Sequence, residues 1–399
     1  MGLNSTPSAE RVHIGIFGKR NAGKSSVINA MTGQSLAIVS DVKGTTTDPV
    51  SKAMELLPLG PVVMIDTPGI DDEGELGALR VKKSYQVLNK TDIAVLVVDA
   101  VTGMTQEDEA LLERIRDKQI PYVLVYNKKD LVQDFVCPQK NSIAVSSETG
   151  ENVRELKELI AAQRPEEVTE RRIVGDLLSP SDFAVLVVPI DKAAPKGRLI
   201  LPQQQTIRDI LESGGTAIVV RERELGQTLE DLAKKPRMVI TDSQVFAQVS
   251  RNTPEDIMLT SFSILFARYK GELQTFVEGV RAVEELTDGD QVLICEGCTH
   301  HRQCEDIGTV KLPGWLQAHT GKKLRFTFTS GVEFPEDLSR YRLIVHCGAC
   351  TLNEREVKYR IACARDAGIP MTNYGILIAY VQGILRRSVQ AFPEVYRLL

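Results

Sequence analysis

The sequence predicts an α/β protein whose parallel sheets are built from alternating strands and helices. Short apolar runs such as VHIGIF (12–17) and FAVLVVPI (183–190) predict buried strands, and helical sequence follows each of them. A chain of 399 residues is too long for one ordinary hydrophobic core. We therefore expect three domains, at residues 8–165, 172–262 and 263–399.

The composition is that of a soluble globular protein. Charged residues make up 25% of the chain and apolar residues 43%, which excludes a disordered chain. The net charge of −5 argues against a general nucleic-acid or membrane binder. The most apolar late segment, GILIAYVQGIL (375–385), is too short to cross a bilayer. There is no secretory signal and the cysteine count is odd, so we expect a cytoplasmic protein.

A glycine-rich loop follows the first predicted strand. The segment GKRNAGKSS matches GxxxxGK[ST], a pattern in which backbone N–H groups surround phosphates and a helix N-terminus adds its dipole. Lys24 would reach the β- and γ-phosphates and Ser25 would bind Mg²⁺. An ordinary glycine-rich turn is the alternative, and the motifs that follow argue against it. The predicted phosphate-binding residues are Gly18, Asn21, Ala22, Gly23, Lys24, Ser25 and Ser26.

Two further motifs fit the metal and the γ-phosphate. MIDTPG ends a strand, so Asp66 can approach Mg²⁺ through water and Gly69 can offer its N–H to the γ-phosphate. GTTTD supplies the threonine of a switch loop, and we assign Thr46 to this role and to Mg²⁺. The predicted catalytic residues are therefore Lys24, Asn21 and Thr46.

The motif NKKD predicts the choice of base. Asn127 and Asp130 match NKxD, in which the aspartate accepts two N–H bonds from guanine. Adenine carries an amino group where guanine has a carbonyl and lacks the 2-amino group, so GTP should be preferred over ATP. Lys128 belongs to the same loop, and Ser146 and Ser147 lie where the last base-contacting loop is expected.

These five motifs, in this order and spacing, resemble the Ras-like small GTPases of the bacterial kind that includes Era and the tRNA-modification GTPase TrmE. The resemblance covers residues 10–165 and implies hydrolysis of GTP to GDP and phosphate. Ile70 stands where Ras has the glutamine that orients water, so intrinsic hydrolysis should be slow or use another charge. Asn21 matches the asparagine that binds K⁺ in the TrmE-like group; the alternative is that it only caps the loop.

The middle of the chain predicts a small parallel α/β layer. Strands at 183–190, 216–221 and 238–243 alternate with helical segments at 202–215 and 225–235. This region holds no motif that carries chemistry. We expect a packing role there, with self-association through an edge strand.

A cysteine pattern divided over two segments marks the last third of the chain. It consists of Cys298-x-His300 and His346-Cys347-x-x-Cys350. Each half follows an apolar strand, and the carboxyl ends of parallel strands meet at one crevice, so three thiolates can converge there. A zinc site that adds Cys295, a redox dithiol and a 4Fe–4S cluster are the alternatives. The long separation argues against a compact zinc ribbon, and Cys295 is also explained as a buried strand residue.

A GTPase domain followed by CxH…HCxxC resembles the FeFe-hydrogenase maturation GTPases (HydF), over the whole chain. The resemblance implies a homodimer with a dimerisation domain at 172–262, and a cluster domain at 263–399 in which Cys298, Cys347 and Cys350 hold a 4Fe–4S cluster. It implies a scaffold that receives a transient CO- and cyanide-bearing di-iron precursor made with two radical-SAM maturases. The scaffold would deliver this precursor to apo FeFe-hydrogenase.

Three cysteines leave the fourth iron of such a cluster to a weaker or exchangeable ligand. His300 and His346 match the motif, either as that ligand or as neighbours of the ligands. Glu305 is a further candidate, and Cys304 would compete with it.

Two other functions remain open from the sequence. A GTPase with a structural zinc domain could act in ribosome or tRNA processes, although the acidic net charge and the absence of a basic patch in the sequence count against it. A redox enzyme is disfavoured because no second cofactor motif is present in the sequence.

Overall fold

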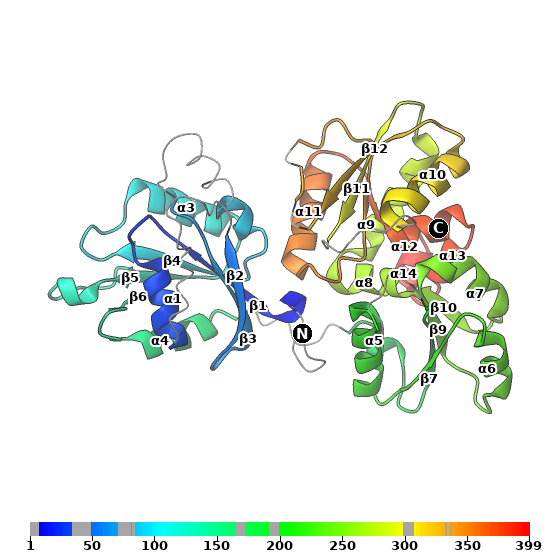
Figure 1. Cartoon of the computed structure of the whole chain (residues 1–399), viewed down its shortest axis with the longest axis horizontal. Coiled ribbons are helices and arrows are strands. Elements are labelled where there is room, and N and C mark those ends of the chain that lie inside the picture. Colours follow the sequence, from blue (N-terminus) through cyan, green and yellow to red (C-terminus); the bar gives the residue numbers. More distant parts are fainter. Residues whose placement is uncertain are drawn as a thin grey trace. The chain divides into compact units, whose positions relative to one another are not determined.

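The fold was analysed in a computed structural model of the chain. The described residues are 8–33, 49–70, 81, 84–164, 172–190, 199–297, 307–331, 333–335 and 337–399. They fall into two compact units, residues 1–169 and 170–399 (Figure 1). Among the described helices, none combines the length and the apolar character needed to traverse a bilayer.

The described part of the first unit forms one six-stranded sheet. Its strands are β1 (Val12–Phe17), β2 (Val50–Leu56), β3 (Gly60–Asp66), β4 (Ile93–Asp99), β5 (Tyr122–Asn127) and β6 (Ser142–Ala144). Its helices are α1 (Lys24–Thr32), α3 (Gln106–Asp117) and α4 (Val153–Ala161). The strand order is β2-β3-β1-β4-β5-β6, and all neighbours are parallel except β2 and β3.

Apolar side chains cover both faces of this sheet. Successive residues of β4 point to opposite faces, so Val95 joins one hydrophobic cluster with Ile14 while Leu96 joins another with Phe17. All four side chains are buried. The near-continuous apolar runs of the central strands follow from this burial on two sides.

The second unit contains two four-stranded parallel sheets. The strands of one sheet are β7 (Phe183–Val187), β8 (Thr216–Val220), β9 (Met238–Thr241) and β10 (Met258–Ser261). Its helices are α5 (Leu201–Glu212), α6 (Leu225–Asp231), α7 (Phe246–Asn252) and α8 (Phe262–Lys270). The strand order is β10-β9-β7-β8.

The other sheet of the second unit has the strands β11 (Gln291–Glu296), β12 (Arg325–Ser330), β13 (Leu343–His346) and β14 (Met371–Asn373). The helices of this part are α9 (Leu273–Gly279), α10 (Leu312–Thr320), α11 (Glu354–Asp366), α12 (Tyr374–Val381), α13 (Leu385–Ser388) and α14 (Pro393–Tyr396). The strand order is β12-β11-β13-β14, the same connectivity as in the sheet before it. Short 3₁₀ or π turns among the described residues are Ser8–Glu10, Lys129–Leu131, Gly175–Leu177, Ser243–Val245, Val280–Glu285 and Ile307–Lys311.

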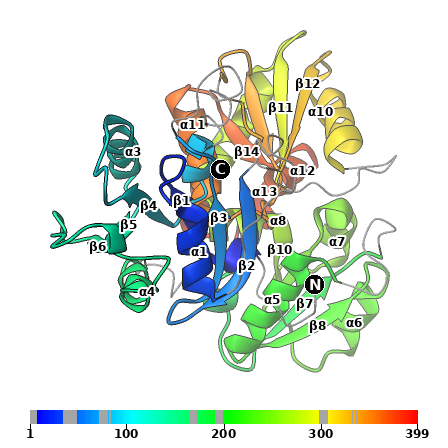
Figure 2. The ribbon, with the colours of Figure 1, turned by 60° about the vertical axis from the view of Figure 1, so that its left-hand side comes forward.

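The strand order places a topological switch point between β11 and β13. After β11 the chain moves outward to β12 on one side, and then crosses to β13 and β14 on the other. Consistent with this reversal, α10 and α11 lie on opposite sides of the sheet (Figures 1 and 2). Open parallel sheets bind ligands outside the carboxyl ends of the strands at such a point.

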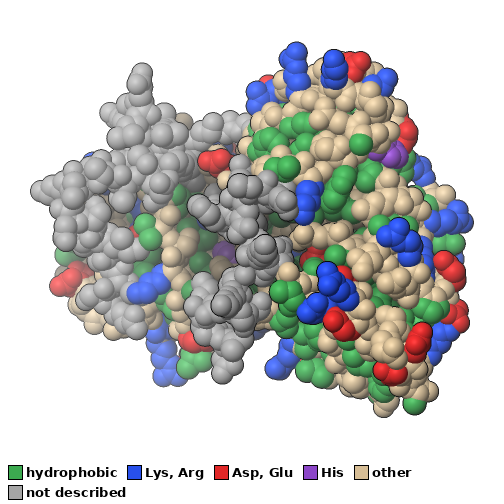
Figure 3. All heavy atoms as spheres, turned by 45° about the vertical axis from the view of Figure 1, so that its right-hand side comes forward, with side chains coloured by type: hydrophobic (Ala, Val, Ile, Leu, Met, Phe, Trp, Pro, Cys, Tyr) green, Lys and Arg blue, Asp and Glu red, His purple; other side chains and the backbone are tan. Residues whose placement is uncertain are grey.

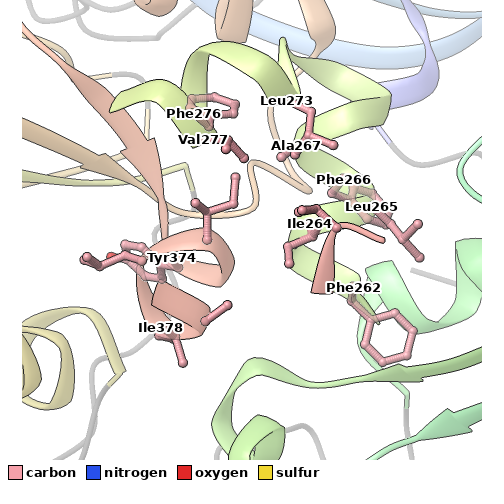
Figure 4. Close-up of a cluster of buried hydrophobic side chains, with 14 of the residues drawn as sticks. Phe262, Ile264, Leu265, Phe266, Ala267, Leu273, Phe276, Val277, Tyr374 and Ile378 are labelled. Carbon is pink, nitrogen blue, oxygen red and sulfur yellow. The ribbon is translucent and has the colours of Figure 1, made fainter. Parts of the chain in front are cut away.

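One hydrophobic cluster extends through both sheets of the second unit. At its centre α8 packs beside α9 and α12, with Ile264, Phe276 and Tyr374 among the side chains drawn in Figure 4. Phe262, the first residue of α8, is also buried in this cluster. The helix therefore belongs to the core of the whole unit.

The α/β fold with parallel sheets that the sequence predicts is confirmed. The strand at 12–17 coincides with β1, whereas the strand expected at 183–190 ends at Val187. The strand β10 was not predicted, because its four residues MLTS carry only a short apolar signal. The three predicted domain ranges stay a prediction.

The face in Figure 3 carries both kinds of charge. Lysine and arginine side chains are interspersed there with aspartate and glutamate side chains, beside hydrophobic ones. On this face the described residues thus form a mixed surface rather than a single basic one.

Candidate functional site: a nucleotide pocket and a cysteine loop

The loop between β1 and α1 requires its two glycines. Gly18 has a φ of +140°, and a Cβ there would lie 2.2 Å from the carbonyl oxygen of Val97. Gly23 has a φ of +90°, and a Cβ there would lie 2.2 Å from Nδ2 of Asn127. Side chains at either position would therefore collide with neighbouring strands or loops, and the backbone adopts a conformation that favours glycine.

Side chains of this loop and of the end of β3 surround a candidate metal position. Lys24 Nζ donates to the carbonyl oxygens of Gly18 (2.9 Å) and Lys19 (2.8 Å). Ser25 Oγ donates to Asp66 Oδ2 at 3.0 Å, while Asp66 Oδ1 is buried and has no hydrogen-bond partner among the described residues. Burial raises the pKa of Asp66, against the lowering effects of Ser25 and Lys24. A buried carboxylate oxygen without a partner fits a nearby Mg²⁺.

Asn127 connects the phosphate loop to the last motif loop. Its Nδ2 donates to the carbonyl oxygen of Ala22 (3.1 Å), and its Oδ1 accepts from the backbone N–H of Ser147 (3.1 Å). Ser146 Oγ donates to Asp130 Oδ1 at 2.5 Å, which fixes the carboxylate that is expected to read guanine. The three motif loops are therefore joined by side-chain hydrogen bonds.

A cavity of about 670 Å³ lies between these loops. The predicted residues that line it are Asn21, Gly23, Lys24, Ser25, Ser26, Asp66, Gly69, Asn127, Lys128, Asp130 and Ser147. Gly18, Ala22 and Ser146 are buried and do not line it, and Thr46 lies outside the described residues. The lining residues that were not predicted are Arg20, Thr67, Leu131 and Glu148.

Ile70 faces the hydrophobic core. It is 6% exposed and belongs to the cluster that contains Val63 and Ile65. A buried aliphatic side chain cannot orient an attacking water molecule. The residue next to the DTPG motif therefore does not serve as a substitute for the glutamine of Ras.

The second candidate site lies at the switch point between β11 and β13. Cys295 pairs in register with His346, and the backbone N–H of Cys347 donates to the carbonyl oxygen of Cys295 at 2.9 Å. Gly297 donates its N–H to Cys347 Sγ (3.0 Å) and accepts from Thr351 Oγ1 (2.7 Å) at its carbonyl oxygen. The segment that leads to position 298 thus lies against the CxxC loop.

The CxxC loop surrounds its sulfur atoms with backbone donors and apolar neighbours. Cys347 Sγ also accepts from the N–H of Ala349, at 3.4 Å. Burial raises the pKa of Cys347, and it raises the pKa of Cys350 to about 11. Such thiols keep their protons at neutral pH unless a metal ion replaces the proton.

His346, the last residue of β13, belongs to a buried hydrogen-bond network with two residues of α11. Arg360 is fully buried; its Nη1 donates to His346 Nε2 (3.0 Å), and its Nε donates to Glu356 Oε1 (2.9 Å). Arginine is always a donor, so Nε2 of His346 accepts and Nδ1 donates to the carbonyl oxygen of Cys347 (2.9 Å). Burial and Arg360 lower the pKa of His346 to about 3. In this structure both ring nitrogens are already engaged.

Several predicted residues of this site lie outside the described part of the chain. They are Cys298, His300, Cys304 and Glu305. Among the described residues, no group of three or more His, Cys, Asp and Glu side chains is placed to hold a metal ion. Cys295 is 0% exposed within β11, as a buried strand residue would be.

Four buried charged residues near the cysteines were missed by sequence reasoning: Lys270, Glu296, Glu356 and Arg360. Arg360 and Glu356 are spaced four apart on a helix, which is a weak signal for a pair. Glu296 accepts from Tyr374 Oη at 3.4 Å, and Lys270 binds the CxxC loop from α8. The contacts of Glu296 and of Lys270 join residues that are far apart in the chain, so no local sequence pattern indicates them.

Three family models match the chain. Residues 13–128 match the 50S ribosome-binding GTPase model, 173–271 match the hydrogen maturase F dimerization domain, and 274–391 match the hydrogen maturase F tetramerization domain. The first unit therefore carries a GTPase domain, and the second carries two domains named for oligomerisation.

Curated GTPases match part of the chain. The tRNA modification GTPase MnmE of Chromobacterium violaceum is 37% identical over 123 residues, which is 31% of this chain and 27% of that protein. The GTPase Der of Wolinella succinogenes is 28% identical over 274 residues, 57% of each chain. The match spans between 27% and 34% of the length of three MnmE proteins.

A crystal structure of Aquifex aeolicus Era bound to GDP and AlF₄⁻ is 20% identical, with a TM-score of 0.35 over 55% of this chain and 97% of that one. The family is decided instead by the C-terminal part, where the two hydrogen maturase F models follow one another behind the GTPase domain. The chain belongs to the hydrogen maturase F family.

Proposed function

We propose that this protein is a GTP-hydrolysing scaffold that binds a 4Fe–4S cluster and delivers a di-iron precursor to apo FeFe-hydrogenase. One observation carries the proposal. In a chain with two hydrogen maturase F domains, the CxxC loop and the segment leading to Cys298 meet at the switch point of a parallel sheet. Iron–sulfur assembly needs reduced thiols, and thiols stay reduced in the cytoplasm. The proposal therefore includes a cytoplasmic location.

The nucleotide pocket supports binding of GTP with Mg²⁺. Lys24 would compensate phosphate charge, Ser25 would ligate the metal, and Asp66 would hold it through water. Asp130, fixed by Ser146, would accept the two N–H groups of guanine. Thr46, from the GTTTD switch loop, would complete the Mg²⁺ site. Bound Mg²⁺ would neutralise charge on the β- and γ-phosphates.

We further propose a K⁺ ion at Asn21. This residue lines the pocket and has a φ of +63°, a conformation that asparagine tolerates better than most residues. Because Ile70 is buried, the side chain after the DTPG motif does not assist the reaction, and a cation near the phosphates would add positive charge to that of Lys24.

If the site at Asn21 holds K⁺ and not Na⁺, replacing Na⁺ with K⁺ at constant ionic strength places a positive charge near the transition state and should raise the rate of GTP hydrolysis roughly tenfold or more. Asn21→Ala should remove the difference between the two salts. Asn89→Ala is the control, because Asn89 is bound to Lys118 on the surface. Equal rates of the wild-type protein in both salts would remove K⁺ from the mechanism.

The residues that would hold the cluster are Cys298, Cys347 and Cys350. The donor set fits, because Cys347 and Cys350 are soft sulfur ligands in a CxxC loop, and the N–H groups of Gly297 and Ala349 donate to Cys347 Sγ. His346 would act as a neighbour that orients the loop rather than as the fourth ligand, because both its nitrogens are engaged. His300 and Glu305 remain the proposed fourth ligands. When bound, the cluster supplies an iron at which the di-iron precursor can dock.

The matched oligomerisation domains support self-association. The strand β8 forms an edge of its sheet, and its Val219 is 44% exposed. An exposed edge of this kind can pair with a second copy. The radical-SAM maturases and apo FeFe-hydrogenase are the other proposed partners.

Anaerobic reconstitution with iron and sulfide tests the proposal. The loaded protein should be brown, and its reduced form should give the EPR signal of a 4Fe–4S cluster. The zinc alternative would need Cys295 as a ligand, and this thiol is 0% exposed. A colourless protein with one bound zinc ion would reject the cluster and favour a role in ribosome or tRNA processes.

A further inference from the structure

Lys270 binds the CxxC loop from another part of the chain. It is the last residue of α8 and is 2% exposed. Its Nζ donates to the carbonyl oxygens of Ala349 (3.2 Å), Cys350 (3.0 Å) and Leu352 (2.8 Å). A lysine ammonium has three hydrogens to donate, and here three acceptors belong to one loop.

The loop has a shape that needs such a donor. Ala349 has a φ of +54°, a left-handed conformation that is unfavourable for a residue with a Cβ. This turn directs several carbonyl oxygens inward, and buried carbonyls without donors are costly. Lys270 satisfies them together, and thereby fixes the backbone between Cys347 and Cys350.

The lysine also brings a positive charge into a buried place. Its nearest aromatic neighbour is Phe266, whose ring centroid lies 5.8 Å from Nζ. Charges act strongly at short range in a poorly hydrated interior. The reduction potential of an iron–sulfur cluster depends on nearby charge, hydrogen bonds and solvent exposure.

Lys270 and the cysteines lie within the matches of two different family models. The dimerization-domain match ends at residue 271, whereas Cys347 and Cys350 lie within the tetramerization-domain match. The helix that carries Lys270 is held by the shared core, in which Ile264, Phe266 and Ala267 are buried (Figure 4). The position of its Nζ is therefore set by the packing of the whole second unit.

We propose that Lys270 is a positioning residue for the cluster, supplied by the end of α8. It holds the CxxC loop in the geometry that lets Cys347 and Cys350 bind one cluster, and its charge favours the reduced, more negative form of that cluster. The inference rests on the proposed cluster-binding function.

The test compares Lys270→Met with Lys270→Arg in the full-length protein, each reconstituted anaerobically. Methionine fills similar space without charge or donors, while arginine keeps both. The measurements are the midpoint potential of the cluster, from EPR-monitored redox titration, and the rate of iron loss to a chelator. Lys358→Met is the matched control, because Lys358 is exposed on α11 and paired with Glu354.

Lys270→Met should shift the midpoint potential to more negative values and speed iron loss roughly tenfold or more, as for other residues that support metal ligands. Lys270→Arg should stay closer to the wild type, and Lys358→Met should match it. Lys270→Gln, which keeps N–H donors without the charge, takes the place of the methionine variant if that variant does not fold.

Two results would overturn the inference. If the neutral variants load a cluster at the wild-type potential and lose iron at the wild-type rate, Lys270 has only a general structural role. If wild-type protein itself takes up no cluster, the proposed function fails first, and this outcome is seen without any variant.

Discussion

Lys24→Ala should abolish GTP hydrolysis while leaving the cluster site intact. Lys24 is the first residue of α1 and lines the nucleotide cavity, with its Nζ held at the loop carbonyls of Gly18 and Lys19. Removing the charge that compensates the β- and γ-phosphates should lower kcat by roughly 10³-fold or more, at the upper end of the effect of one transition-state donor. Phosphate release under saturating GTP measures this effect.

The second half of this prediction concerns the other unit. Cys347, Cys350 and the residues that support them lie within residues 170–399, whereas Lys24 lies within residues 1–169. Reconstituted Lys24→Ala protein should therefore carry the same iron content and EPR signal as the wild type. Lys118→Ala is the control, because Lys118 is at the end of α3 and binds Asn89. Loss of the iron signal in a folded Lys24 variant would contradict the independence of the two sites.

The nucleotide site was predictable because its geometry is encoded in short segments. Gly18 and Gly23 adopt positive φ values and leave no room for a Cβ, so the sequence must show glycine there. Asn127 ends β5 and Ser147 lies after β6, and parallel strands bring such positions to one edge of the sheet. Spacing along the chain was sufficient to identify residues that line one cavity.

The cysteine site was predictable only in part. The sequence shows thiols after two apolar strands, and the pairing of Cys295 with His346 brings those strands side by side. The contacts that shape the loop come from elsewhere: Arg360 from α11, and Lys270 from a helix that precedes β11. Long-range contacts of single charged residues leave no periodic pattern along the chain, so one sequence taken alone does not reveal them.

Weak local signals explain what the sequence left out of the fold. The strand β10 has four residues and depends on its pairing with β9. The strand β7 ends at Val187 although the apolar run continues to Ile190, which is 77% exposed. Tertiary pairing decides where a short strand begins and ends, and local apolar character does not.

Cys347→Ser and Cys350→Ser should each strongly destabilise the cluster. A serine hydroxyl is a hard, weakly acidic ligand in place of a soft thiolate. Since replacing even a supporting residue changes metal affinity about 10–100-fold, iron content after desalting should fall by roughly tenfold or more. Iron and sulfide analysis, together with the EPR spectrum of the reduced protein, measures the loss. Cys363→Ser is the control, because Cys363 lies within α11 and packs partly buried against the core.

The fourth ligand should behave differently from the cysteines. His346 is engaged by Arg360 and by the carbonyl oxygen of Cys347, so His300 and Glu305 remain the proposed fourth ligands. Removing an oxygen or nitrogen ligand should leave the cluster assembled and shift its EPR spectrum. Added imidazole or cyanide should then bind at the open iron.

An exchangeable position is what a carrier needs, because a cluster held by four thiolates has no iron at which a cyanide-bearing di-iron unit could dock. The competing arrangement, with Cys304 as fourth ligand of a purely structural cluster, gives the opposite result. Cys304→Ser would then lose as much iron as Cys347→Ser, and added imidazole would leave the wild-type spectrum unchanged. Equal loss of iron in Cys298→Ser, Cys347→Ser, Cys350→Ser and Cys304→Ser would therefore reject the exchangeable iron and, with it, the docking step of the proposed function.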